Sequence, residues 1–334
     1  MRLGRTALAL ALFTATGLLV AQGPGPAPGY QLLESWGPVP HDPVPLRNYI
    51  AWNKDVFWEM GRVAVNPKGD RLYAFRRSDP PILQIDPATG KILKEFGHGM
   101  FVWPHGMHID KDNNLWVTDG SVANNEDVLA KKLKPALDAG YGHQVFKFSP
   151  EGKVLLTLGT KGVPGDDATH FNAPADVIVA PNGDIFVADG HVGTRVAKFD
   201  RNGKFLKSWG TKGTGPGQFS QPHGIAMDSK GRVFIGDRGA GGGIEIFDQE
   251  GNFIALWTQF GNPSGVAIST DDTIYVTDQG KRIVTVGSAK DGTVTGIIPD
   301  VWAEGVSVDE KHTLYAAEVY RRRLKKILFT PPGR

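Results

Sequence analysis

The sequence predicts an all-β fold, a six-bladed β-propeller, from two observations. The first is a repeated unit, clearest in residues 171–210, of four short alternating or β-branched runs separated by Asn-Gly and similar turns. The second is a fixed register, because 15 residues separate Pro174 from Asp189 and the same offset recurs in the other copies. The acidic positions 189, 237, 278 and 318 are 48, 41 and 40 residues apart, which is the period of a four-stranded blade.

Six copies of this unit follow one another along the chain. They begin, in order, at about residue 56, Trp103, residue 171, residue 217, Pro263 and Ala303. The unbroken repeat argues against two separate β-domains. The last copy ends near Phe329 after three strands, and residues 30–37 resemble residues 204–210. We therefore expect the N-terminal strand to complete the sixth blade and close the ring over residues 30–334, which would leave few open sheet edges.

The N-terminal residues have the composition of a secretory signal. Arg2 and Arg5 precede a short apolar run at 7–20, and small residues near Ala21 suit cleavage. We predict a signal peptide over residues 1–22 and a stiff Pro/Gly spacer over 23–29. A membrane anchor is the alternative, although the apolar run is short for a spanning helix. The mature protein is expected to be exported, to the periplasm or the extracellular space, with no stable membrane insertion.

The net charge and the composition limit the classes of partner that the protein is expected to bind. The formal net charge is +2 and cleavage would remove two arginines, so nucleic acid is not expected as a partner. The chain has no cysteine and is long enough to fold on its core alone, and we expect a monomer. The basic run at 321–326 is interpreted as a solvated strand, with an anion-binding patch as the alternative. An insertion at 121–142 in the second blade is either a lid or a surface decoration.

The residue after the recurring proline predicts an axial metal site. This position carries Ala175 and Ser264 in repeats three and five, but His105, His223 and Glu304 in repeats two, four and six. Alternate blades of a six-bladed ring are about 120° apart, so these three side chains should converge on the axis. Two histidines and one carboxylate with a fourth position open are a common catalytic zinc set.

Two segments carry a family resemblance. They are WPHGMHIDKDNNLWVTDG at 103–120 and QPHGIAMD at 221–228. The chain resembles the NHL-repeat propellers, and among them the peptidyl-α-hydroxyglycine α-amidating lyases, through essentially all of its mature length. The resemblance implies zinc on the axis held by three histidines, an arginine and a tyrosine acting on the substrate, and a structural Ca²⁺ that plugs the channel through backbone carbonyls.

The resemblance can be carried over position by position. The first two zinc histidines match His105 and His223, and the third position holds Glu304. The arginine position falls on Arg77, with Arg76 as its neighbour. The tyrosine position holds His191, which could act as a base or as an additional ligand. The residues suit Zn²⁺ but do not separate it from iron, manganese or nickel.

The resemblance implies an exported metal-dependent lyase. Such an enzyme would cleave a peptide or small-molecule substrate ending in α-hydroxyglycine into an amide and glyoxylate. The alternative is a non-catalytic NHL propeller that binds a peptide or protein partner, with Trp52, Trp58, Trp103 and Trp302 lining a recognition surface. The recurring acidic residues are interpreted as structural, through bonds to backbone N–H groups, and His108 as a packing residue. A propeller lactonase or another hydrolase is the least favoured of the functional hypotheses.

Overall fold

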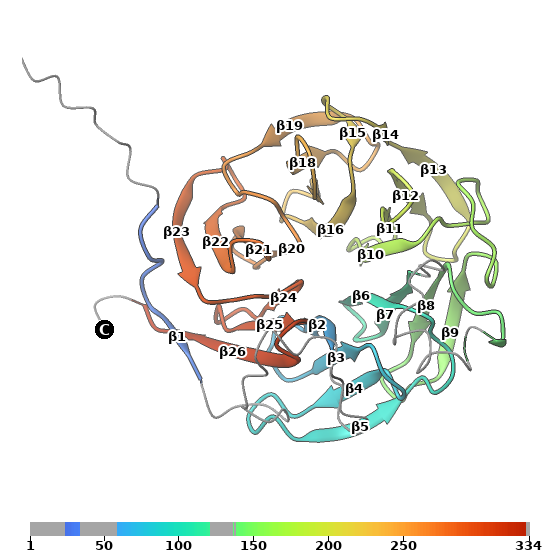
Figure 1. Ribbon diagram of the computed structural model, residues 1–334, viewed down its shortest axis with the longest axis horizontal. Coiled ribbons are helices and arrows are strands. Elements are labelled where there is room, and N and C mark those ends of the chain that lie inside the picture. The colour runs from blue at the N-terminus through green and yellow to red at the C-terminus, as the bar shows by residue number, and fades with distance from the viewer. Residues whose placement is uncertain (1–23, 34–58, 121–135, 137, 332–334) are drawn as a thin grey trace, which may run out of the picture.

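The protein is built from six four-stranded antiparallel sheets around a central axis (Figure 1). The computed structural model describes residues 24–33, 59–120, 136 and 138–331. The predicted six-bladed propeller is confirmed within these ranges. The predicted signal peptide, the first residue of the spacer, most of the insertion at 121–142, Trp52 and Trp58 lie outside the described residues.

The strands follow one another from the axis outward in the first five blades. The first blade consists of β2 Met60–Val65, β3 Leu72–Arg76, β4 Ile82–Ile85 and β5 Ile92–Phe96. The second consists of β6 Pro104–Ile109, β7 Leu115–Asp119, β8 Gln144–Phe148 and β9 Val154–Leu158. The third consists of β10 Pro174–Val179, β11 Ile185–Asp189, β12 Arg195–Phe199 and β13 Phe205–Trp209. The next two consist of β16 Pro222–Met227, β17 Val233–Asp237, β18 Gly243–Phe247 and β19 Phe253–Trp257; and β20 Gly265–Ile268, β21 Thr273–Asp278, β22 Ile283–Ser288 and β23 Val294–Pro299. A short parallel pair, β14 Thr211–Lys212 and β15 Gln218–Phe219, links the third and fourth blades.

The sixth blade combines both ends of the described chain. It contains β24 Gly305–Val308, β25 Leu314–Glu318 and β26 Arg323–Phe329, and its outer strand is β1 Tyr30–Leu32, which pairs antiparallel with β26. Its inner strand β24 contacts β2 of the first blade. Part of the predicted spacer lies along the neighbouring blade, since Ala27 N donates to Ile297 O at 2.7 Å and Ile297 N donates to Gly25 O at 3.0 Å. Residues 34–37, predicted to extend the outer strand, lie outside the described residues.

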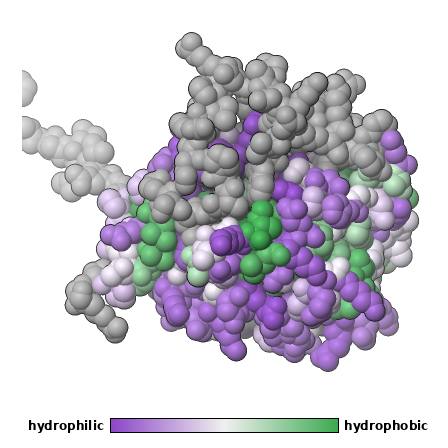
Figure 2. Space-filling view, turned by 90° about the horizontal axis from the view of Figure 1, so that it is seen from below, coloured by the Kyte–Doolittle hydropathy of each residue, from purple (hydrophilic) through white to green (hydrophobic). Residues whose placement is uncertain are grey.

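Apolar side chains fill the space between neighbouring blades. Between the first two blades, the buried aromatic residues Phe75, Phe101 and Phe146 pack together. The Phe75 and Phe101 rings meet edge to face with centroids 5.1 Å apart, a favoured aromatic geometry. In Figure 2 the outer surface of the described residues is mainly hydrophilic, with smaller apolar patches. Within the described ranges, no helix has the length and apolar character needed to cross a membrane.

The recurring acidic residues hold the segments that lead into the inner strands. Asp119 accepts hydrogen bonds from the backbone N–H groups of Val102 and Trp103, the latter at 2.6 Å. Asp237 and Glu318 accept equivalent bonds in the fourth and sixth blades. Each bond ties the end of a blade's second strand to residues just before its first strand. The carboxylates therefore fix the backbone close to the predicted metal ligands.

Candidate metal centre

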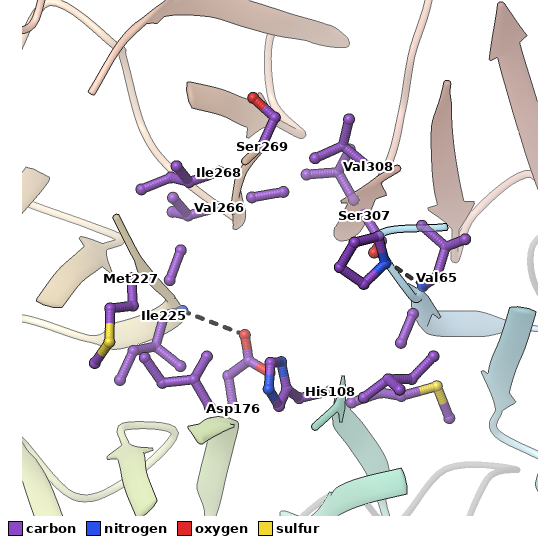
Figure 3. A pocket seen from close by; sticks show the side chains of 18 of the residues that line it. Val65, His108, Asp176, Ile225, Met227, Val266, Ile268, Ser269, Ser307 and Val308 are labelled. Carbon is purple, nitrogen blue, oxygen red and sulfur yellow. Dashed lines mark hydrogen bonds between the residues drawn. The ribbon is translucent and has the colours of Figure 1, made fainter. Parts of the chain in front are cut away.

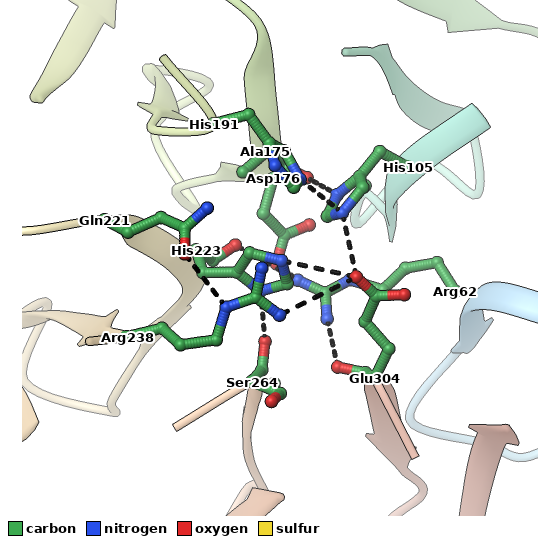
Figure 4. A network of polar contacts seen from close by, with 12 residues as sticks. Arg62, His105, Ala175, Asp176, His191, Gln221, His223, Arg238, Ser264 and Glu304 are labelled. Atoms are coloured by element: carbon green, nitrogen blue, oxygen red, sulfur yellow. Dashed lines mark hydrogen bonds and ion pairs between the residues drawn. The ribbon is translucent and has the colours of Figure 1, made fainter. Parts of the chain in front are cut away.

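Four side chains that can bind a metal meet at one end of the propeller axis. His105 and His223 are the second residues of β6 and β16, and Glu304 directly precedes β24. His191 comes from the turn after β11. One nitrogen or oxygen atom of each side chain lies within 4.8 Å of the others. Figure 4 shows the three ligands predicted from the repeat, together with His191, pointing toward one another from four different blades.

The spacing of the donor atoms suits a small metal ion. His105 Nε2 lies 3.2 Å from Glu304 Oε1, and His223 Nε2 lies 3.4 Å from the same oxygen. Ligands about 2.0–2.1 Å from a tetrahedral zinc are about 3.3 Å from one another. His191 Nε2 lies 2.7 Å from His105 Nε2, which is a hydrogen-bond distance. His191 is therefore placed either to join the ligand set or to exchange a proton beside it.

Backbone carbonyls set the tautomers of two histidines. His105 Nδ1 donates to Ala175 O at 2.6 Å, and His223 Nδ1 donates to Ser264 O at 2.5 Å. These bonds leave each Nε2 with its lone pair directed at Glu304. Among the described residues, the buried His223 Nε2 has no hydrogen-bond partner. Two lone pairs that face a carboxylate oxygen without a proton between them repel it, and a bound cation would satisfy all three atoms.

The charges are also those of a ligand set. Burial lowers the pKa of His105, and burial with neighbouring positive groups holds the pKa of His191 and of His223 well below the usual range. Burial opposes ionisation of Glu304, but the Arg77 guanidinium beside it keeps its pKa well below the usual range. Metal ligands must be deprotonated. Neutral imidazoles and one carboxylate fit zinc or another divalent transition metal.

Arg77 reaches this centre, and its neighbour Arg76 does not. Arg77 Nη2 donates to Glu304 Oε2 at 2.9 Å, and its guanidinium lies 4.4 Å from the centroid of the Trp103 ring. Arg76 instead donates to Glu95 at 2.9 Å, on the outer part of the first blade. At the ligand position of the first blade stands Gly61, where a Cβ would lie 3.7 Å from Arg77 Nε. The small residue leaves room for the guanidinium.

A second arginine, Arg238, lies at the centre and was not predicted from the sequence. Arg238 Nη1 lies 3.9 Å from Glu304 Oε1, and its Nε donates to Gln221 Oε1 at 3.1 Å. The side chain is 22% exposed, more than the ligands around it. Arg238 follows the recurring acidic residue of its repeat, where the second and third repeats have Gly120 and Gly190. The same position holds Arg77 in the first repeat, and a second arginine there is the signal that could have found it.

Three further residues have their contacts outside the group of four donor side chains. His108 lines a cavity farther along the axis. His143 Nδ1 accepts a hydrogen bond from Ala173 N at 3.1 Å. The Trp302 ring packs against Tyr320, with centroids 4.9 Å apart, and Arg282 lies 4.2 Å from the Trp302 centroid. Trp302 is thus held between a turn of the fifth blade and a turn of the sixth.

Part of the chain is similar in sequence to known proteins. No family model matches the chain. A stretch of 132 residues, 39% of the chain, is 38% identical to peptidyl-α-hydroxyglycine α-amidating lyase 1 of Drosophila melanogaster. A stretch of 131 residues is 41% identical to peptidyl-glycine α-amidating monooxygenase B of Xenopus laevis. This chain is similar in sequence to the amidating lyases. The resemblance predicted from the Pro-His-Gly segments is confirmed.

The extent of these similarities is limited. The matched stretches cover 20% of the Drosophila lyase and 13% of the Xenopus protein, and 39% of this chain rather than its whole mature length. Among solved structures, a streptogramin B lyase superposes with a TM-score of 0.57 over 90% of this chain and 98% of its own, at 12% identity. At that identity the likeness describes the fold.

Proposed function

We propose that the chain is a metal-dependent lyase that cleaves a peptidyl-α-hydroxyglycine into a peptide amide and glyoxylate. The observation that carries the proposal is the group of three histidines and Glu304, of which only His191 is partly exposed, in a chain similar to named amidating lyases. In the reaction the bond between the amide nitrogen and the hydroxylated carbon breaks. That carbon becomes the aldehyde of glyoxylate, and the hydroxyl proton ends on the amide nitrogen, so atoms and charge balance.

The residues around the centre have separable roles in this reaction. His105, His223 and Glu304 would hold the metal, which when bound acts as a Lewis acid toward the substrate hydroxyl. His191 presents Nε2 to the centre and is kept neutral by burial. With the metal on His105 Nε2, the hydrogen bond between the two rings is released, and His191 Nε2 would then be available to accept the hydroxyl proton. The proton then passes to the departing amide nitrogen.

The two arginines suit the charge of the substrate. An α-hydroxyglycine terminus carries a carboxylate, and glyoxylate retains it. Arg77 is fixed by Glu304 and the Trp103 ring, whereas Arg238 is partly exposed and can turn its guanidinium to a ligand. Guanidinium groups bind carboxylates through two parallel hydrogen bonds. We assign Arg77 to positioning beside the metal and Arg238 to the substrate carboxylate.

The test combines metal content with product analysis. Purified protein is analysed for metals by mass spectrometry and then incubated with a peptide ending in α-hydroxyglycine, with glyoxylate and peptide amide both quantified. We expect about one equivalent of a transition metal and equal amounts of the two products. A His105→Ala/His223→Ala variant should lose both the metal and the activity. His98→Ala, which changes an exposed histidine on the first blade, serves as the matched control.

Two results would contradict the proposal in different ways. A protein that takes up no transition metal even when zinc is supplied would lack the centre, and the non-catalytic binding propeller would then be the better description. A protein that binds metal but releases no glyoxylate would keep the centre and lose the assigned reaction. If the protein binds metal but releases no glyoxylate, a His191→Tyr variant is assayed in the same way. Glyoxylate release gained in that variant would show that the histidine at this position prevents the lyase reaction.

We also propose that the protein is exported. The support is the sequence of residues 1–22, with its basic start, short apolar run and small residues near Ala21. Cell fractionation followed by N-terminal sequencing of the mature chain tests this. A mature protein that begins near residue 23 in the exported fraction is expected, and an intact N-terminus in the cytoplasmic fraction would contradict it.

A further inference from the structure

A second layer of charge lies on the axis directly beside the metal centre. It is formed by the residue that follows the ligand position in each inner strand. The pairing of inner and second strands makes six residues equivalent: Arg62, Gly106, Asp176, Gly224, Gly265 and Gly305. Four are glycines, and two carry opposite charges on the first and third blades.

The charged pair spans the axis and is buried. Arg62 Nη2 donates to Asp176 Oδ2 in an ion pair in which the two side chains are 4% and 6% exposed. Asp176 Oδ2 also accepts a hydrogen bond from Ile225 N at 3.2 Å. Figure 4 shows Arg62 entering from the first blade beneath the ligands. This pair lies outside the ligand set, and nothing in the proposed reaction uses it.

The glycines of this layer make room for the pair. A Cβ at Gly305 would lie 2.5 Å from Arg62 Cδ, and one at Gly265 would lie 3.0 Å from Arg62 Nη1. A Cβ at Gly106 would lie 2.6 Å from the Asp176 Cα. Contacts this short are not tolerated in packed interiors. Gly106, Gly265 and Gly305 and the two charged residues are therefore one packing solution.

The guanidinium satisfies the backbone groups that face the axis. Arg62 Nη1 donates to Glu304 O at 3.0 Å, and Arg62 Nη2 lies 3.4 Å from His223 O. A calcium ion needs six to eight oxygen ligands. At this level the two carbonyls and Asp176 Oδ2 already have the guanidinium as their cation, and Asp176 Oδ1 is the one oxygen of this group without a hydrogen-bond partner among the described residues. The residues present do not fit the structural Ca²⁺ that the family resemblance implies.

We propose that the Arg62 guanidinium takes the place of an axial metal cation in this chain, so that the propeller needs no calcium on its axis. The covalently attached cation joins the backbone of two metal ligands, Glu304 and His223, to the third blade through Asp176. It also separates the metal centre from a cavity of about 460 Å³ that lies farther along the axis. Figure 3 shows His108 and Asp176 at this cavity, with apolar side chains such as Ile225 and Val266 around them.

The proposal is tested by calcium response, independently of the lyase reaction. Wild-type protein is stripped of metals and dialysed, and its Tm is measured with zinc alone, 1 mM calcium alone, and both. A calcium site with a Kd of about 10 μM would raise Tm by roughly 5 °C under these conditions. We expect the wild-type Tm to respond to zinc but not to calcium, with no retained calcium by mass spectrometry. One equivalent of calcium, or a calcium-dependent rise in Tm, would overturn the proposal whatever the activity assay shows.

An Arg62→Gly variant tests the replacement directly. It leaves the Asp176 carboxylate and the carbonyls of Glu304 and His223 facing a cation-sized space. We expect its Tm to rise with 1 mM calcium, or with guanidinium ion at low millimolar concentration, while the wild type stays unchanged. An Arg62→Gly protein that responds to neither cation would contradict the proposal. If that variant does not fold, the wild-type calcium titration decides alone.

Discussion

The two layers on the axis are built from neighbouring positions of one repeat, yet they are satisfied in opposite ways. In the first layer, His105 Nε2 and His223 Nε2 direct lone pairs at Glu304 Oε1, 3.2 and 3.4 Å away. In the second layer, Arg62 and Asp176 neutralise each other and hydrogen-bond to nearby backbone. In the first layer no proton or cation stands between the two histidine nitrogens and Glu304 Oε1, although Arg77 pairs with Glu304 Oε2, whereas the second layer contains the cation that its own carboxylate faces.

The difference teaches how a repeat can produce either a metal centre or a structural ion pair. Ligands occupy the second, fourth and sixth blades, so three donor atoms converge and two of them direct lone pairs at the third. The charged pair occupies the first and third blades, and glycines elsewhere give it space. Which blades carry the large residues decides whether the layer binds an external ion. The predictions below separate the two layers, beginning with the largest expected effect.

Breaking the ion pair should destabilise the protein most. Asp176→Ala leaves the Arg62 guanidinium buried without its carboxylate, and removing one partner of such a pair costs about 3–5 kcal/mol. Chemical denaturation of the metal-loaded protein measures the loss. Asp112→Ala, which removes an exposed carboxylate paired with Lys111, should stay within about 0.5 kcal/mol of wild type. Equal small losses in both variants would mean that the axial pair is not strongly coupled to folding.

Removing the negative charge of Glu304 from the first layer should lower the affinity for the metal. Glu304→Gln keeps the size of the side chain but leaves Arg77 and Arg238 without their carboxylate. Because even residues outside the ligand shell change metal affinity by 10–100-fold, we expect a loss of about 100-fold or more in zinc affinity. Competition with a chromophoric chelator measures it. Glu95→Gln, on the exposed side of Arg76, is the control. Zinc affinity within a few-fold of wild type would remove Glu304 from the ligand set.

Glu245 is a buried carboxyl group without an ion-pair partner among the described residues, and its pKa is raised as a result. Glu245 on β18 accepts one hydrogen bond, from Gly217 N at 2.8 Å, and burial raises its pKa to about 7. The folded protein therefore keeps this proton between about pH 4.5 and 7 while the unfolded chain releases it, so stability falls as pH rises. We expect wild type to lose about 2 kcal/mol relative to Glu245→Gln between pH 5 and 8. Denaturation at both pH values checks this, and parallel curves would contradict it.

The sequence contains enough information for the fold and for most of the first layer, but not for the second. A fixed offset from proline to acidic residue identifies equivalent positions in five repeats, and that is how His105, His223 and Glu304 can be aligned. The first repeat lacks the proline, because Met60 stands there. Without that marker, Arg62 cannot be matched to Asp176, and the ion pair becomes visible only when strand pairing gives the register. Arg238 was missed because its approach to Glu304 depends on how the turn after β17 folds.

The smallest effect expected is also the most local, and it distinguishes two adjacent arginines. Lysine keeps the charge of Arg77 but loses the planar group that reaches Glu304 Oε2 and lies over the Trp103 ring. Arg77→Lys should therefore lower kcat/KM for an α-hydroxyglycine peptide by about tenfold while zinc remains bound. Arg76→Lys makes the same change one residue earlier, where the guanidinium contacts Glu95, and should leave kcat/KM within about twofold. Equal losses in the two variants would point to a disturbed first blade rather than to a role for Arg77 at the metal centre.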